Sequence, residues 1–190
     1  MAIGNPDTEP PIMKRAVFFF AIALILWVGL SAAQTPPNRV IENGDFDASP
    51  VGQAPSGWKP AYPTGSATVA KDEKDTFLRL SSADGENAGV AQDVPVPQKK
   101  TKVQVLGRMR GKPKNEKTEK RAAVEVALRY KDSNGATLSA AVVASENSPY
   151  WHTFRRELDL PAGCASIEVV ARSIFAVGTF DFDEVRVEFK

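Results

Sequence analysis

Apolar and polar residues alternate along most of the chain after residue 38, as in strands that bury one face. In residues 122–131, for example, Val124, Val126 and Leu128 share one phase. Similar patterns predict strands at 39–46, 66–71, 76–81, 89–96, 101–111, 122–131, 136–144, 150–160, 166–175 and 177–189. No stretch after the first 33 residues has a clear helical period. The pattern therefore predicts an all-β fold.

Turn signals separate these predicted strands. Residues 132–135 read Asp-Ser-Asn-Gly, which favours a tight hairpin turn, and residues 48–63 carry four prolines and two glycines, which favour a loop. About ten short strands at such intervals are typical of an antiparallel β-sandwich. We therefore expect a single antiparallel β-sandwich over residues 38–190.

The pattern of the last predicted strand changes phase at one point. Phe180 and Phe182 alternate with polar residues, and Val185 resumes the alternation one position out of phase. This slip predicts a β-bulge at Asp183-Glu184, which would turn one carboxylate away from solvent. A carboxylate in that position needs a partner, which could be an arginine, backbone N–H groups or a metal ion.

The first 33 residues have the pattern of a secretory signal peptide. A basic start at Lys14-Arg15 precedes an uncharged apolar run over residues 16–30, and small residues at 31–33 offer a cleavage site. Either Met1 or Met13 could be the start. The alternative is an uncleaved hydrophobic helix, with residues 16–33 as a membrane anchor at the lower length limit for a span.

Both alternatives place the remaining chain outside the cytoplasmic membrane. We expect a secreted, periplasmic or cell-surface protein, which contacts a membrane only if the signal is not cleaved. Residues 34–37 then form a short linker that contains Pro36 and Pro37.

Composition excludes several kinds of chemistry. With one cysteine among 190 residues, no intrachain disulfide can form, and Cys164 is either a small buried side chain or an exposed thiol. A zinc site or a Ser-His-Asp triad would have to use His152, the only histidine. Residues 99–121 carry ten basic and two acidic residues, but no nucleic-acid-binding motif accompanies them, so we expect no nucleic-acid partner.

Five short motifs occur in an order that is shared with a known superfamily. They are Asn43-Gly44-Asp45-Phe46-Asp47, Gly57-Trp58, Leu78-Arg79-Leu80, Val90-Ala91-Gln92-Asp93-Val94 and the closing Asp183-Glu184-Val185. In these motifs the chain resembles the carbohydrate-binding-module superfamily with the galactose-binding-like jelly roll. The resemblance covers residues 38–190 and implies a jelly-roll sandwich that binds glycan without catalysis.

The resemblance also implies roles for particular residues. In that superfamily the first and last strands are neighbours and often hold a structural calcium ion. Asp47 and Asp183 are the matching acids in this sequence. The alternative is that both acids cap turns or pair with arginines. Trp58 and Trp151 match positions that usually pack in the core.

The candidate ligand-binding residues are polar side chains on the outward phase of the long strands, together with one loop tyrosine. They are Gln104, Arg108, Glu125, Arg129, Glu168, Arg172 and Tyr62. On one concave sheet surface they could bind a polysaccharide or other glycan, neutral or anionic, because arginine and glutamate bond to hydroxyls and arginine also holds carboxylate or sulfate. An ordinary solvated face of ion pairs is the alternative.

Two other functions remain open from sequence. A structural or adhesive surface domain could use the same sandwich for protein contacts. A glycan-cleaving enzyme would need two carboxylates about 5–9.5 Å apart, and Glu125 with Glu168 is the pair to test. Non-catalytic glycan binding is the function that we expect.

Overall fold

The computed structural model describes residues 40–115 and 121–190, and these contain strands and no helix. Two five-stranded sheets are formed, and all neighbouring strands are antiparallel. Sheet A contains, in spatial order, β1 (Lys59–Pro60), β4 (Ala88–Pro95), β9 (Ser166–Ile174), β6 (Ala123–Lys131) and β7 (Thr137–Ser145). Sheet B contains β2 (Ser66–Lys71), β3 (Thr76–Ser82), β10 (Gly178–Phe189), β5 (Lys102–Arg110) and β8 (His152–Asp159). The predicted all-β sandwich is confirmed.

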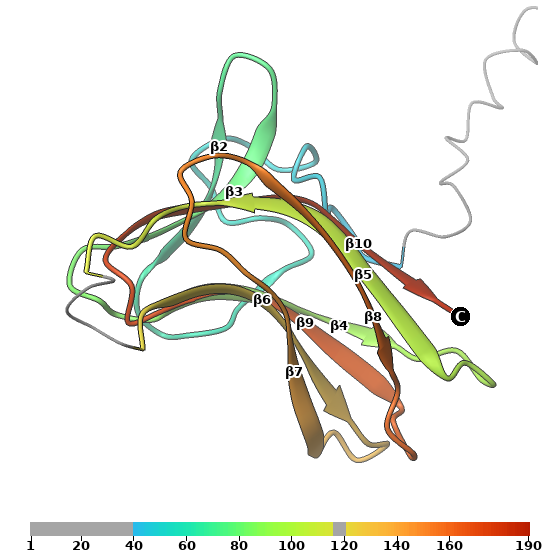
Figure 1. The fold of residues 1–190 in the computed structure, drawn as a ribbon. Coiled ribbons are helices and arrows are strands. Elements are labelled where there is room, and N and C mark those ends of the chain that lie inside the picture. The colour runs from blue at the N-terminus through green and yellow to red at the C-terminus, as the bar shows by residue number, and fades with distance from the viewer. Residues whose placement is uncertain (1–39, 116–120) are drawn as a thin grey trace, which may run out of the picture. The chain divides into compact units, whose positions relative to one another are not determined.

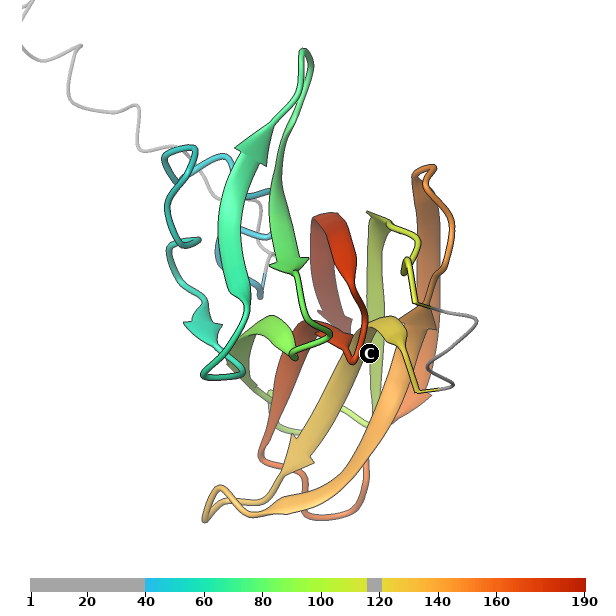
Figure 2. The ribbon, with the colours of Figure 1, turned by 90° about the vertical axis from the view of Figure 1, so that its left-hand side faces the viewer.

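The two sheets stack face to face and bury the core between them. Leu128 of sheet A and Phe180 and Phe182 of sheet B are fully buried in this core. Both sheets bend in the same sense, with sheet A on the inner side of the arch (Figure 1). The hairpin of β2 and β3 projects from the body (Figures 1 and 2). The outer face of sheet A is therefore the concave face of the sandwich.

The segment 40–46 forms turns, so the strand predicted at 39–46 is wrong over these residues. Asn43 and Phe46 have φ angles of 50° and 56°, and this left-handed backbone cannot continue as a strand. The expected contact between the two ends of the domain is nevertheless present. The Val185 N–H donates to the Gly44 carbonyl at 2.8 Å, and Phe46 is buried against Trp58.

The Asn-Gly-x-Phe motif has a structural explanation in this segment. The Asn43 side-chain amide donates to Ser49 Oγ at 2.8 Å, and its oxygen accepts from the Ala48 N–H at 3.0 Å, which holds the loop closed. A β-carbon on Gly44 would lie 2.0 Å from the Val185 carbonyl oxygen. Position 44 therefore needs glycine, because the loop backbone packs directly on β10.

The predicted bulge in the last strand is confirmed. The register between β10 and β5 shifts between Asp183 and Arg186, and Glu184 has a φ of 52°. The bulge lets Phe182 and Val185 both face the core although they are three positions apart.

The two tryptophans occupy different environments. Trp58 is buried in the core, as predicted. Trp151 lies instead at the outer face of sheet B, where the guanidinium groups of Arg108 and Arg110 stack on its ring at 4.8 and 4.5 Å. The prediction that Trp151 packs in the core is wrong, because it precedes β8 at the point where the chain crosses between sheets.

The predicted signal peptide, membrane anchor and linker lie in residues 1–37, outside the described residues. Across residues 40–115 and 121–190, we find no helix of the length and apolarity that crossing a membrane requires.

The close approach of Gly44 to Val185 predicts the effect of a substitution. Gly44→Ala should lower the free energy of unfolding by about 1–3 kcal/mol, because the new methyl group collides with backbone rather than with a flexible side chain. Urea unfolding measures this change. Asp47→Ala, an exposed change in the same loop, should stay within about 0.5 kcal/mol of wild type. Equal stability of the Gly44 variant and wild type would contradict the predicted clash.

Candidate functional site

The concave outer face of sheet A carries most of the predicted ligand-binding residues. In β9, Ile167, Val169 and Ala171 point into the core, so the alternate residues Glu168 and Arg172 point outward. The same alternation in β6 turns Glu125 and Arg129 outward, because Val124, Val126 and Leu128 face the core.

The strand register arranges these outward residues in three rows that cross the sheet. The apolar row contains Ala91, Val170, Ala127 and Val142 from β4, β9, β6 and β7, with Lys59 of β1 at its end. The Arg172 row pairs Arg172 with Glu125, and the Glu168 row aligns Asp93, Glu168 and Arg129. The two polar rows are four residues apart along each strand, or about 13 Å.

Three members of the apolar row are buried although they lie outside the core between the sheets. Ala91, Val170 and Ala127 are at most 2% exposed and do not belong to the core cluster, whereas Val142 is 38% exposed. The long side chains of the two polar rows stand on either side of the three buried residues and cover them. The face is therefore mainly polar, and Val142 on β7 is the member of the row that offers apolar surface to solvent.

The Arg172 row is an ion pair. Arg172 Nε and Nη2 both donate to Glu125 Oε2, at 3.0 and 2.7 Å, and Tyr62 lies close enough to raise the pKa of Arg172. Burial lowers the pKa of Arg172, but the bonds to Glu125 and Tyr62 outweigh burial and place this pKa above its ordinary value. Arg172 therefore stays charged and is held in a fixed orientation.

The Glu168 row centres on one buried carboxylate with three cations. Arg129 Nη1 donates to Glu168 Oε2 at 2.8 Å, and Lys131 Nζ and Lys59 Nζ lie 3.1 Å from Oε1. Both lysines also pair with Asp93. Burial raises the pKa of Glu168, but the hydrogen bonds from Lys59, Lys131 and Arg129 outweigh it, so the pKa lies below its ordinary value.

The structure brings together five of the seven predicted ligand-binding residues. Glu125, Arg129, Glu168 and Arg172 lie on the concave face, and Tyr62 joins them through Arg172. The other two, Gln104 and Arg108, lie on β5 in sheet B, so the expectation that all lie on one sheet surface is corrected. Apolar and polar residues alternate in β5 just as they do in β6. This alternation does not show that the chain crosses to the other sheet between the two strands.

Sequence reasoning missed Lys59, Asp93 and Lys131 as members of this site. Asp93 stands on the outward phase of its strand, which is a signal that the sequence does contain. Its position beside Glu168 depends on the pairing of β4 with β9, which separates these residues by 75 positions in the chain and cannot be read from local pattern.

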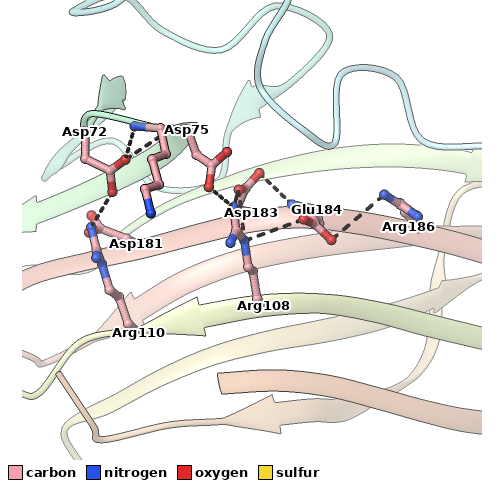
Figure 3. Close-up of polar contacts among 9 residues, drawn as sticks. Asp72, Asp75, Arg108, Arg110, Asp181, Asp183, Glu184 and Arg186 are labelled. Atoms are coloured by element: carbon pink, nitrogen blue, oxygen red, sulfur yellow. Dashed lines mark hydrogen bonds and ion pairs between the residues drawn. The ribbon is translucent and has the colours of Figure 1, made fainter. Parts of the chain in front are cut away.

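The outer face of sheet B holds Asp183 in a network of arginines and acids. Arg108 Nε and Nη2 donate to Asp183 Oδ2 at 3.1 and 2.5 Å, and the Glu184 N–H donates to Oδ1 at 2.7 Å. Arg79 and Arg110 donate to Asp181. Asp72 and Asp75 of the projecting hairpin pair with Arg110 and Arg108 and complete the network (Figure 3). The partners of the bulge carboxylate are thus an arginine and a backbone N–H group.

These contacts bear on the predicted calcium ion. Calcium needs six to eight oxygen ligands. Asp183 already has Arg108 and a backbone N–H as partners, whereas Asp47 is exposed in its loop. Within residues 40–115 and 121–190, no cluster of three or more His, Cys, Asp or Glu side chains could hold a metal ion. The two acids as placed do not fit a calcium site, and calcium stays a sequence-based prediction.

Glu125 and Glu168 belong to different rows, so their backbones are about 13 Å apart. Each is also committed to an arginine.

Comparison with known proteins gives similarity in structure but not in sequence. No protein-family model matches the chain, and a search of curated proteins found no match. Among solved structures, the CBM22-1 xylan-binding domain of Paenibacillus barcinonensis Xyn10C has a TM-score of 0.51 and 14% identity, over 80% of this chain and 91% of that chain. TmCBM61, solved in complex with β-1,4-galactotriose, has a TM-score of 0.51 and 16% identity, over 80% of this chain and 99% of that chain.

A larger protein also contains the fold. The enzymatically active domain of tailspike protein 4 of bacteriophage CBA120 has a TM-score of 0.62 and 14% identity, over 80% of this chain but only 21% of that one. This chain thus spans about a fifth of the length of that protein. The neighbours are mainly carbohydrate-binding modules, and the chain has their jelly-roll sandwich fold.

The lowered pKa of Glu168 predicts a pH dependence of stability. A carboxylate with a depressed pKa stabilises the fold above its unfolded-state pKa, about 4.5, and this stabilisation is lost as the pH falls through the folded-state value. Glu168→Gln should cost about 1–3 kcal/mol at pH 7 and less at about pH 3.5. Urea unfolding at both pH values measures the difference.

Glu86→Gln is the matched control, since Glu86 is exposed on a loop. Its effect should be within about 0.5 kcal/mol at both pH values. If Glu168→Gln cost the same free energy at both pH values, the three cations would not be what lowers the pKa of Glu168.

Proposed function

We propose that this protein binds glycan without catalysis, on the concave face of sheet A. The observation that carries this proposal is the pair of polar rows on either side of the apolar row. Their charged groups are paired and oriented before any ligand arrives, which lowers the entropic cost of binding.

The chemistry of the rows suits a polyhydroxylated ligand. Glu125 accepts hydrogen bonds from hydroxyls through its Oε1, while Arg129 and Arg172 donate to hydroxyl oxygens and buried Glu168 holds Arg129 in place. Val142 of the apolar row is 38% exposed and suits the apolar face of a sugar ring, and Tyr62 adds an aromatic ring beside Arg172.

The structural neighbours support the same class of ligand. Their titles describe a xylan-binding domain and a complex with β-1,4-galactotriose. Identities of 14–16% carry only the fold, so the sugar itself is not transferred. Export, which the apolar run at residues 16–30 supports, would bring the domain to extracellular glycans.

A glycan array carrying neutral and acidic oligosaccharides tests the proposal. We expect the 34–190 fragment to bind at least one glycan, and Arg172→Ala to weaken this binding about 10-fold or more, because a charged donor is lost. Tyr62→Phe removes one hydroxyl at nearly constant shape and should weaken binding less.

Arg155→Ala is the control for loss of positive charge, since Arg155 is exposed on β8 of the other sheet. It should bind as wild type does. A blank array, or equal losses in the Arg155 and Arg172 variants with native melting temperatures, would overturn the proposed site.

A second candidate function is protein contact through the edge strand β7. The strand carries no charged residue from Thr137 to Ser145, and Leu138 is 43% exposed. Long uncharged edge strands can accept a strand from a partner. A blank glycan array together with saturable binding to another exported protein, lost in Leu138→Lys, would favour this function.

A further inference from the structure

An open depression of about 530 Å³ lies where the apolar row ends at β1. It exists because β1 has only two residues, which pair with Val90 and Ala91. β1 therefore does not extend along the second half of β4. Trp58 and Ala91 supply apolar lining, and Glu42, Lys59 and Asp93 supply charged groups. The depression therefore combines an apolar surface with hydrogen-bonding groups of both signs.

The walls of the depression are held together by one buried side chain. Gln92 of β4 is 8% exposed and accepts a hydrogen bond from the Glu42 N–H at 2.8 Å. Its amide nitrogen donates to the carbonyls of Glu42 and Gly57 at 3.0 and 2.9 Å. Three separate chain segments are thereby fixed relative to one another, and the depression is preformed.

Gly57 lets the Glu42 side chain lie against the wall. A β-carbon at position 57 would come within 3.3 Å of both Cβ and Oε2 of Glu42, and Gly57 has a φ of 79°. Glu42 is exposed, and its carboxylate makes no hydrogen bond or ion pair with any residue in the part of the chain that the structure describes. It is an acceptor at the rim of the depression that is available to a ligand.

The depression continues directly from the concave face. Lys59 lines it and also bonds to Glu168, which belongs to the Glu168 row on β9. Ala91 and Asp93 are likewise members of both surfaces. A glycan that follows the apolar row across the sheet would therefore place its last residue in the depression.

The charges around the depression select the kind of sugar. Lys59 is shared between Asp93 and Glu168, both of which it partly neutralises. The carboxylate of Glu42 has no ion-pair partner among the described residues, so it accepts hydrogen bonds from hydroxyls but repels a second carboxylate. A neutral sugar satisfies this arrangement, and a uronic acid does not.

We propose that this depression is an end subsite that binds a neutral terminal sugar residue and disfavours a uronic acid, with Glu42 as the specificity-determining residue. This inference rests on the proposed function, because the subsite is the end of the same glycan-binding face. It adds that the glycan chain runs across the strands and that the sugar at one of its ends is preferred neutral.

The test uses an array that carries xylohexaose and β-1,4-galactotriose beside the same oligosaccharides capped with a uronic acid at the non-reducing or reducing end. Wild type should bind a neutral member more tightly than at least one of its two capped forms, the one whose uronic acid enters the depression. Glu42→Gln should weaken binding of that neutral member about 10-fold and reduce the preference over at least one capped form. Glu73→Gln removes the same charge from the exposed β2–β3 turn and should bind as wild type does.

The outcomes separate this inference from the proposed function. If neutral glycans bind and Arg172→Ala weakens them while Glu42→Gln does not, the end subsite is wrong and the concave face stands. Tighter binding of capped than neutral forms by wild type likewise overturns the subsite alone. If no member of the array binds, both proposals fail.

Discussion

The register of β9 against its two neighbours is the constraint on which the site depends. Val170 stands opposite Ala91 on one side and Ala127 on the other, which sets Glu168 beside Arg129 and Arg172 beside Glu125. A slip of one residue would turn these charges into the core and Ile167 and Val169 out to solvent. The hydrophobic core therefore fixes the polar rows on the opposite side of the same strands, although it does not touch them.

The charged rows on both outer faces follow one electrostatic rule. Glu168, Asp181 and Asp183 are each at most 5% exposed, and each is met by at least one arginine. Such pairs contribute little net stability, because the cost of removing two charges from water offsets their attraction. Their effect is to hold side chains in fixed orientations. On sheet B the network joins the projecting hairpin to β10, whereas on sheet A the oriented groups face open solvent and the adjoining depression.

Much of the fold could be predicted from local pattern, and the site only in part. Alternation located the strands, and the phase slip at Asp183-Glu184 located the bulge, because both are properties of neighbouring residues. The segment 40–46 was predicted as a strand because its apolar residues Ile41 and Phe46 are buried, although they belong to a loop of turns. Gln104 and Arg108 were placed on the wrong sheet because long-range pairing decides which strands are neighbours. Lys59 and Asp93 were missed for the same reason.

We propose that a glycan lies on the outer face of sheet A, across β4, β9 and β6. Backbone amide chemical shifts of the protein, recorded during titration with the tightest array ligand, test this position. We expect the shifted resonances to belong to residues of the three rows and of the Glu42–Lys59 rim, while the outer face of sheet B stays unchanged. Shifts concentrated around Arg108, Asp181 and Trp151 would contradict it.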